Sequence, residues 1–326
     1  MESNEIKKRI LGKSGLEITS ISLGLWAIGG DGFGKTDDQN SLDTIDVALD
    51  AGINFFDTAD VYGMGHSEYL LGQAMENRRE KFIIASKIGW INFDNENQST
   101  VYTSVEKVIE AVETALGRLK TEYIDLLQSH INFKDPTMEI MLEGFQRMQE
   151  QGKIRAYGVS TSDFEYFKEF NSDNKCSSLQ IDYSILNRTP EIDFFPYCLE
   201  NNIGVLVRGP IAMGILTGKF DQNTKFGDKD FRVAWTDDSE RRNIFLKDLK
   251  KVEKLRAFCV KKTLAQFALQ FSISNPAVTA AIPGAKTVKQ LNENIQAAYI
   301  PQLTMEELDK IDKITKPGGG RKIWPA

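Results

Sequence analysis

Cysteine and histidine are scarce in this chain. Among 326 residues there are three cysteines, Cys176, Cys198 and Cys259, and two histidines, His66 and His130. The cysteines lack metal-ligand spacing and two histidines cannot build a multi-histidine centre, so we expect no metal site. An odd set of scattered thiols suits a reducing compartment, and we therefore expect a cytoplasmic protein.

Long apolar runs and a basic excess are also missing. No stretch approaches the roughly 18 uninterrupted apolar residues of a membrane helix, and residues 1–9 lack the apolar core of a secretory signal. The formal net charge of −6 argues against nucleic acid as a general partner. An anion that binds here must be held by a local cluster of cations. An oligomer is possible, but no feature predicts one.

The glycine fingerprint of Rossmann dinucleotide-binding folds is absent. Residues 29–34 are rich in glycine, but they lack the Gly-x-Gly-x-x-Gly spacing and no helix follows directly. The segment is more typical of a mobile loop, which we expect to lie over a pocket. A dinucleotide must therefore be held by other elements.

Short apolar runs alternate with helix-like stretches along most of the chain. Eight runs read as strands, several apolar nearly throughout, as strands covered on both faces are: Ser20–Trp26, Ile53–Asp57, Phe82–Ile88, Tyr123–His130, Ile154–Ser160, Ser178–Tyr183, Gly204–Gly209 and Thr279–Gly284. Helices are predicted between and after them, the seventh stretch comprising two: Asp38–Asp50, Ser67–Asn77, Thr103–Leu119, Pro136–Gln151, Ser162–Phe170, Pro190–Asn201, Val252–Ile273 and Thr287–Ala298. The pattern predicts one α/β domain over residues 1–326, a (β/α)8 TIM barrel, with a doubly wound sheet as the alternative.

Three additions decorate this frame. Residues 9–18 read as an N-terminal β-hairpin turning at Gly12–Gly15, which could plug the lower mouth of the barrel. The stretch Lys219–Lys247 has no clear period and leaves a strand at its carboxyl end, where long loops are usually functional. Asp309–Trp324 is predicted to add an extra C-terminal helix and a tail.

Four polar residues stand at or just past the ends of three predicted strands. Asp57, Tyr62, Lys87 and His130, which we call the tetrad, should converge because a parallel barrel gathers its strand ends on one face. A phenol, an ammonium, a carboxylate and an imidazole together can deliver a proton. His66, by contrast, reads as the loop and cap of the next helix.

Carbonyl reduction is a reaction that needs this set. The carbon receives a hydride and the oxygen a proton, so an acid must stand within hydrogen-bond reach of the oxygen. A free tyrosine, with a pKa of about 10, holds its proton tightly. We expect Lys87 to lower the pKa of Tyr62 and Asp57 to keep Lys87 charged. His130 can donate a hydrogen bond to the substrate oxygen.

The chain resembles the aldo-keto reductases, in motifs that keep the family's order from about Leu11 to Ala298. The matching segments are Asp57-Thr58-Ala59-Asp60-Val61-Tyr62-Gly63, Ser67-Glu68, Leu71-Gly72, Ser86-Lys87, Asp125–His130, Gly158–Ser160, Gln180, Leu216–Lys219 and Ile282–Gly284. The later motifs look more like the bacterial branches. The resemblance implies a barrel enzyme that reduces an aldehyde, ketone or sugar-like carbonyl with NADP(H), with Tyr62 as proton donor.

Residues after the last predicted strand fit the dinucleotide. Gly284 opens a turn into a helix, a place where unpaired N–H groups bind anions. In the family Lys286 corresponds to a ligand of the 2′-phosphate, which favours NADP over NAD, although Gln290 replaces a frequent arginine. The resemblance also assigns Glu293 and Asn294 to the adenine.

The nicotinamide end shows departures from the family. By resemblance Ser160 and Gln180 hold the carboxamide, while Thr161 replaces the usual asparagine. Arg208, followed by Gly209, stands where a tyrosine usually stacks on the ring. Arg208 could stack there, or bind a phosphate or an acidic substrate, and its charge would favour reduction by disfavouring the oxidised ring.

Tryptophans are expected on the active-site face. Trp26 ends the first predicted strand and should line the cofactor and substrate cleft, where it could pack on a sugar ring or simply fill the wall. Trp90, Trp235 and Trp324 are further candidates.

Two rival functions stay open. The same barrel could be a cofactor-binding regulatory subunit without significant turnover, like the potassium-channel β subunits, although an intact tetrad argues against lost catalysis. A non-redox barrel such as an isomerase or lyase would leave the anion-binding turn at Gly284 without a role.

Overall fold

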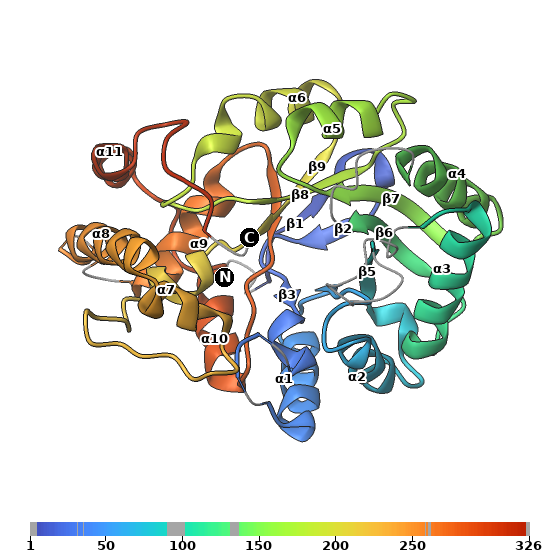
Figure 1. Ribbon diagram of the computed structural model, residues 1–326, viewed down its shortest axis with the longest axis horizontal. Helices are drawn as coiled ribbons and strands as arrows, with labels where there is room; N and C mark the ends of the chain where they lie inside the picture. The colour runs from blue at the N-terminus through green and yellow to red at the C-terminus, as the bar shows by residue number, and fades with distance from the viewer. Residues whose placement is uncertain are drawn as a thin grey trace.

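Eight parallel strands form a barrel at the centre of the molecule (Figure 1). The computed structural model describes residues 5–30, 32–34, 36–89, 102–130, 137–257, 259 and 262–323. Parallel bridges from Ile21 to Ala281 and from Gly24 to Gly284 join the edges of the sheet. The predicted barrel is confirmed, with strands β3 (Leu23–Gly24), β4 (Phe55–Asp57), β5 (Ile83–Ile88), β6 (Ile124–His130), β7 (Ile154–Ser160), β8 (Ser178–Asp182), β9 (Gly204–Arg208) and β10 (Val278–Ala281).

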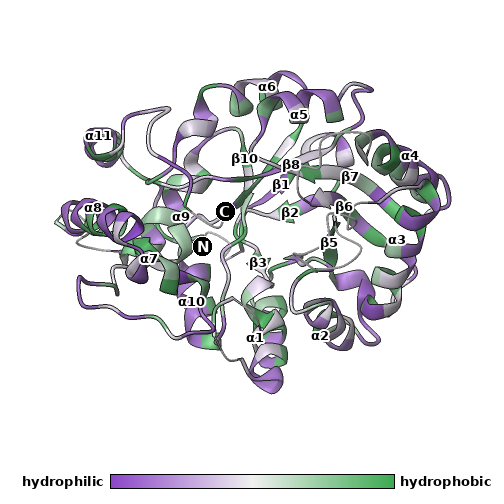
Figure 2. Ribbon diagram, in the orientation of Figure 1, coloured by the Kyte–Doolittle hydropathy of each residue, from purple (hydrophilic) through white to green (hydrophobic). Residues whose placement is uncertain are grey.

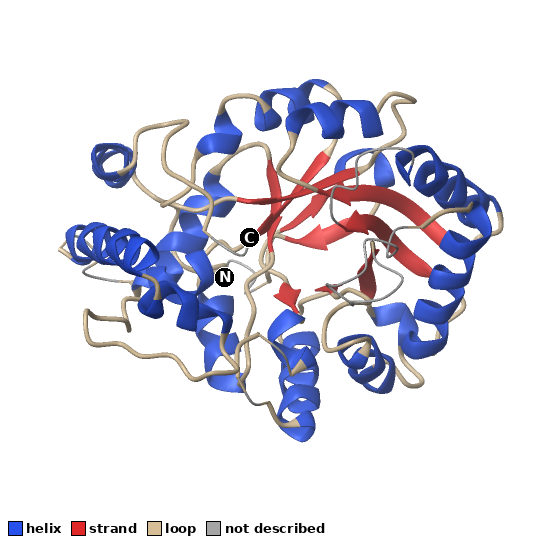
Figure 3. Cartoon of the chain, viewed as in Figure 1, coloured by secondary structure: helices blue, strands red, loops and turns tan. Residues whose placement is uncertain are grey.

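Helices surround the strands (Figure 3). Polar side chains fix where several of them begin: Asp37, Ser104 and Asp163 each accept a hydrogen bond from a backbone N–H of the first turn. The helices that follow the barrel strands are α1 (Asp38–Asp50), α2 (His66–Ala74), α3 (Val105–Leu119), α4 (Thr137–Glu150), α5 (Phe164–Phe170), α6 (Phe194–Glu200), α9 (Leu264–Ser274) and α10 (Val288–Gln296).

Residues inside the barrel change from apolar to polar along the strands. Towards the amino ends the interior is an apolar cluster that includes Phe55, Ala85, Leu126, Ala156 and Leu206. Because side chains in a strand alternate between faces, the residues two positions further on point to the same side. Those positions hold Asp57, Lys87, Gln128, Gly158 and Arg208. The alternation therefore places polar groups at the carboxyl end of the barrel, while the apolar cluster fills its amino end.

The N-terminal hairpin closes the opposite end, as the sequence predicted. Strand β1 (Lys8–Ile10) pairs antiparallel with β2 (Glu17–Thr19), and Leu11 and Ile18 join the apolar cluster inside the barrel. Gly12 has a φ of +50°, and a Cβ there would lie 2.4 Å from the backbone nitrogen of Gly204. Only glycine allows the hairpin to approach the barrel this closely.

Two helices begin earlier than the sequence predicted. Helix α8 (Ser239–Arg256), preceded by the short α7 (Ala234–Asp237), starts inside the stretch predicted to be irregular. Its sequence is dominated by charged residues, so it lacks the apolar periodicity from which a helix is predicted. Asp238 caps the helix by accepting a hydrogen bond from the Arg241 N–H. Helix α11 (Met305–Ile314) starts before Asp309, at a capping box formed by Thr304 and Glu307 that the prediction missed.

Hydropathy follows this arrangement. The outer helices carry both hydrophobic and hydrophilic stripes, and α8 is largely hydrophilic (Figure 2). The larger apolar core joins helix residues such as Val112 and Phe145 to strand residues such as Ile84 and Leu127. None of the helices in the described ranges is long and apolar enough to cross a membrane.

Candidate active site

A cleft of about 890 Å³ opens at the carboxyl ends of the barrel strands. Every residue predicted to act in catalysis or to bind the cofactor lines it except Lys87, which is fully buried behind the wall. The lining includes the predicted residues Trp26, Asp57, Tyr62, His130, Ser160, Gln180, Arg208, Gly209, Gly284, Lys286, Gln290, Glu293 and Asn294. The barrel thus brings together residues that are distant in sequence.

The Lys87 ammonium is the centre of the tetrad. Its Nζ donates hydrogen bonds to Asp57 Oδ2 at 2.7 Å, to the Thr58 carbonyl at 2.8 Å and to Tyr62 Oη at 3.0 Å. An ammonium has three donors, and here each has an acceptor. The pKa of Lys87 is raised: burial alone would lower it, but the Asp57 carboxylate, Tyr62 and the hydrogen bonds outweigh burial. The lysine therefore stays charged although it is buried.

The Asp57 carboxylate is held from two sides. Gln180 Nε2 donates to Asp57 Oδ1 at 2.7 Å, while Lys87 takes the other oxygen. The sequence assigned Gln180 to a nicotinamide carboxamide. In the structure its amide N–H₂ orients the Asp57 carboxylate of the tetrad. The two residues are 123 positions apart, so no local motif predicts this hydrogen bond.

A tight turn carries Tyr62 from β4 to the cleft. Gly63 has a φ of +59°, and a Cβ there would lie 2.0 Å from the Gly29 carbonyl oxygen, so glycine is required. This approach brings the segment Trp26–Gly29 against the turn. The rings of Trp26 and Tyr62 stack with centroids 5.9 Å apart and an interplanar angle of 17°.

Burial, more than Lys87, sets the acidity of Tyr62. The pKa of Tyr62 is raised because burial disfavours the phenolate, and the lowering by Lys87 offsets this only in part. The sequence predicted the lowering by Lys87, but not the larger opposing effect. The phenol therefore keeps its proton at neutral pH, which is the form that an acid needs.

His130 stands edge-on to Tyr62. The two ring centroids are 6.0 Å apart at an interplanar angle of 89°. The pKa of His130 lies well below its usual value because the ring is buried and because Lys87 and Arg208 repel a second positive charge. A neutral imidazole can donate a hydrogen bond to an oxygen in the cleft without carrying charge.

The other end of the cleft holds the turn after β10. The Lys286 N–H donates to Gln290 Oε1 at 2.8 Å, and Thr287 caps α10 by accepting from the Gln290 N–H. Asn294 Nδ2 reaches back to the Gly284 carbonyl at 3.3 Å. Glu293 lies on the same wall.

Three lysine and arginine side chains, which we call the basic cluster, gather at this end. Lys219, Arg232 and Lys286 all line the cleft, and the pKa of Lys219 is lowered by burial first and then by the charges of the other two. The sequence singled out Lys286 alone. Arg232 comes from the long stretch after β9 and is held by Asp230 and the Met213 carbonyl.

An aromatic cover that the sequence missed joins two loops over the cleft. Phe33 and Phe231 contact edge to face at 4.9 Å, and the Phe231 ring stacks on Trp26 with centroids 5.6 Å apart. The Phe33 carbonyl accepts from Lys286 Nζ at 2.8 Å. The glycine-rich loop was expected over the pocket, and Phe33 does line it. Its partner in the long loop carried no sequence signal.

The remaining predicted residues lie elsewhere. Trp235 is buried behind the cover, 6.0 Å from the Phe231 ring centroid, and is not part of the cleft lining. His66 is not in the cleft lining: it is the first residue of α2, after the cap residue Gly65, and pairs with Asp38 at 2.9 Å. Trp90, Trp324 and Pro136 lie outside the described residues.

The chain is similar to several known oxidoreductases. An uncharacterized oxidoreductase of Bacillus subtilis is 33% identical over 314 residues, which cover 95% of this chain and 97% of that protein. The NADH-specific methylglyoxal reductase of Escherichia coli is 30% identical over 311 residues, covering 90% of this chain and 94% of that protein. The holo form of an aldo-keto reductase from Bacillus halodurans has a TM-score of 0.80 at 30% identity, covering 98% of this chain and 99% of that one.

The match to the family as a whole includes every barrel strand. Residues 20–316 match the Aldo/keto reductase family, a span from just before β3 to just after α11. The chain belongs to the aldo/keto reductase family.

Proposed function

We propose that this protein uses NADPH to reduce an aldehyde, ketone or sugar-like carbonyl to the alcohol, with Tyr62 as proton donor. The observation that carries the proposal is the buried Lys87 ammonium, hydrogen-bonded to both Asp57 and Tyr62 at one end of a cleft. The basic cluster lies in the same cleft and suits the phosphates of a dinucleotide. Family membership supports an oxidoreductase that uses a nicotinamide cofactor.

The residues divide the work by position. The bound cofactor supplies the hydride. Tyr62 donates its proton to the carbonyl oxygen, and Lys87 stabilises the phenolate that remains, since its Nζ lies 3.0 Å from Oη. His130 donates a hydrogen bond to the same oxygen and stabilises its developing negative charge. Asp57, fixed by Gln180, keeps the ammonium in place.

Phosphates fit the opposite end by their chemistry. Lys219 and Lys286 supply positive charge there, and the turn at Gly284 leads into the N-terminus of α10. We propose that Ser160 and Gln180 hold the carboxamide. Glu293 and Asn294 then contact the adenine, and Gly209 lets the backbone approach the cofactor. The three cysteines are unpaired, which is compatible with cytoplasmic action by a single domain.

An NADPH-coupled carbonyl screen tests the proposal. Binding is followed by quenching of tryptophan fluorescence, and turnover by loss of NADPH absorbance with a panel of aldehydes and ketones. Both should be seen. Binding without turnover on any carbonyl would favour the regulatory subunit, and failure to bind either nicotinamide cofactor would overturn both readings.

Lys286→Ala should weaken the preference for NADPH over NADH. Removing a charge that pairs with the 2′-phosphate should raise the KM for NADPH roughly tenfold and change the KM for NADH little. Lys289→Ala, an exposed lysine on α10 outside the cleft lining, is the matched control. Equal losses with both cofactors would show that Lys286 does not read the 2′-phosphate.

A further inference from the structure

Arg208 is a cation in the cleft with donors left over. It ends β9, lines the cleft, and makes one hydrogen bond within the described structure, from Nη2 to Ser162 Oγ at 3.0 Å. Its Nε is buried and has no partner. A guanidinium has five N–H donors in a planar fork that matches a carboxylate or phosphate. The site is therefore built for an anion that these side chains do not supply.

The neighbouring carboxylate does not use these donors. Asp182 is the register partner of Arg208 between β8 and β9, so both side chains point to the same face. Its Oδ2 accepts from Asn187 Nδ2 at 2.7 Å and from the Ile323 N–H at 3.3 Å. Its Oδ1 has no hydrogen-bond partner, and no ion pair joins it to Arg208 within the described structure. Arg208 and Asp182 are thus neighbours, but the arginine fork stays open.

A second cation arrives on the C-terminal tail. Lys322 lines the cleft and is exposed to solvent. Its pKa is lowered, first by the protein atoms packed around it and then by the charge of Arg208. Arg208, Lys322 and the Asp182 carboxylate therefore share this corner. The nearby Asp57 carboxylate is paired with Lys87, so one positive charge is in excess.

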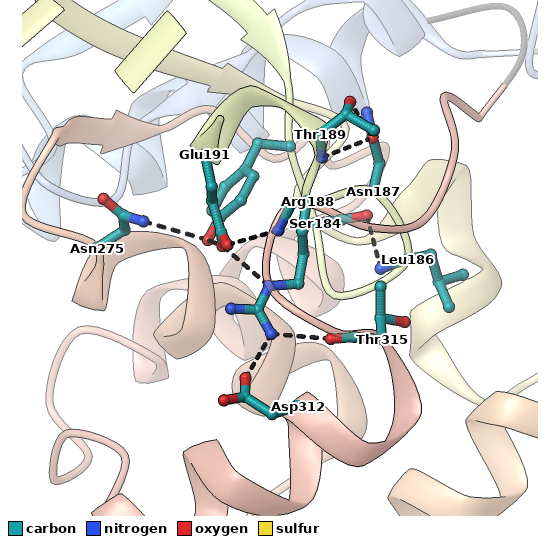
Figure 4. A network of polar contacts seen from close by, with 11 residues as sticks. Ser184, Leu186, Asn187, Arg188, Thr189, Glu191, Asn275, Asp312 and Thr315 are labelled. Atoms are coloured by element: carbon teal, nitrogen blue, oxygen red, sulfur yellow. Dashed lines mark hydrogen bonds and ion pairs between the residues drawn. The ribbon is translucent and has the colours of Figure 1, made fainter. Parts of the chain in front are cut away.

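A polar network holds the tail in place. The Arg188 guanidinium donates to Glu191, to Asp312 and to the Thr315 carbonyl (Figure 4). The tail is then tied along its length: the Arg188 N–H donates to the Gly319 carbonyl at 2.7 Å, and the Arg321 N–H to the Leu186 carbonyl at 3.0 Å. The position of Lys322 beside the cleft is thus built into the fold.

The corner of Arg208 and Lys322 is distinct from the basic cluster. In the basic cluster, Lys286 Nζ donates to the Phe33 carbonyl at 2.8 Å and Arg232 Nη2 donates to Asp230 Oδ2 at 2.6 Å. Arg208 instead donates to Ser162 and lies beside Asp182 on β8. Arg208 lies close enough to the tetrad for its charge to lower the pKa of Tyr62, after the larger effects of burial, Lys87 and Asp57. One positive site thus suits the cofactor phosphates, and the other lies where the substrate must meet Tyr62.

We propose that Arg208 and Lys322 form an anion subsite that binds a carboxylate or phosphate carried by the carbonyl substrate. This inference rests on the proposed reductase function and names its substrate class, an acidic aldehyde or ketone. Arg208 donates hydrogen bonds to the anion from its free N–H groups, and Lys322 adds positive charge beside them. An anion held in this way orients the carbonyl of the same substrate towards Tyr62 and His130.

Matched substrates test the subsite. The rates are compared for 4-oxobutanoate and its methyl ester, and for glyceraldehyde 3-phosphate and glyceraldehyde. The wild-type kcat/KM should be roughly 10- to 100-fold higher for the charged member of one pair, as expected for a charge-assisted hydrogen bond. The pair that shows the preference identifies the anion as carboxylate or phosphate.

Variants separate this role from cofactor binding. Arg208→Gln should lower the ratio of kcat/KM for the charged substrate to that for the neutral one close to unity, and Arg208→Lys should restore part of this ratio. Lys322→Gln should lower the ratio roughly three- to tenfold. Lys316→Gln, an exposed lysine of the same tail outside the cleft lining, is the control. Equal losses on charged and neutral substrates, or no wild-type preference, would overturn the subsite.

A binding measurement keeps the two proposals distinguishable. If no carbonyl is turned over, the reductase proposal fails, but succinate and inorganic phosphate can still be titrated calorimetrically into wild type and Arg208→Gln with NADPH present. Binding of either anion that is lost in the variant would support the subsite. Absence of binding of both anions to wild type would overturn it.

Discussion

Tyr62→Phe should lower the kcat for carbonyl reduction by about 10²- to 10⁴-fold, the usual contribution of a positioned general acid. The variant keeps the ring and its stacking on Trp26 and removes only the proton that the carbonyl oxygen must receive. Lys87 loses one acceptor but retains Asp57 and the Thr58 carbonyl. We therefore expect the fold and the affinity for NADPH to change little.

Two measurements on the same variant make this result specific. NADPH affinity, followed by fluorescence quenching, should stay within about threefold of wild type, because the hydroxyl that is removed bonds to Lys87 and has no proposed contact with the cofactor. Tyr69→Phe, an exposed tyrosine on α2, is the control for loss of a hydroxyl. Turnover retained in Tyr62→Phe would exclude Tyr62 as the acid and leave His130 as the nearest proton source.

The barrel and the convergence of the tetrad could be predicted because both depend on local periodicity. Apolar runs with polar ends give the strands, and alternation along a strand puts Phe55 and Asp57 on one face, as it does Ala85 and Lys87. Parallel pairing then brings the ends together. Only Tyr62 depends on a loop, because the turn at Gly63 carries it from the end of β4 to the cleft.

The features that the sequence missed depend on tertiary contacts or burial. The hydrogen bond from Gln180 to Asp57 crosses the barrel, and the pair of Phe33 and Phe231 joins two loops. The raised pKa of Tyr62 follows from how deeply the ring is buried, which no residue type discloses. Helix α8 has too little apolar surface to produce a helical period.

Lys87→Met should destabilise the protein by about 3–5 kcal/mol and also abolish turnover. The substitution leaves the Asp57 carboxylate buried, with Gln180 as its remaining side-chain donor. An uncompensated buried charge is costly, whereas the methionine itself fits the space of the lysine stem. Urea unfolding followed by circular dichroism measures the loss, and it should be seen as a lower midpoint.

The double variant Asp57→Asn/Lys87→Met separates the structural cost from the chemistry. With both charges gone, neither position 57 nor position 87 carries an unpaired buried ion, so the free energy of unfolding should recover to within about 1–2 kcal/mol of wild type. Turnover should not recover, because no ammonium remains to stabilise the Tyr62 phenolate after proton transfer. Asp57→Asn alone should fall between the two in stability, since Lys87 then keeps the Thr58 carbonyl and Tyr62 as acceptors. A double variant that regained turnover would show that the phenol works without the ammonium, whereas one that stayed as unstable as Lys87→Met would show that the cost lies in packing and not in the buried charge.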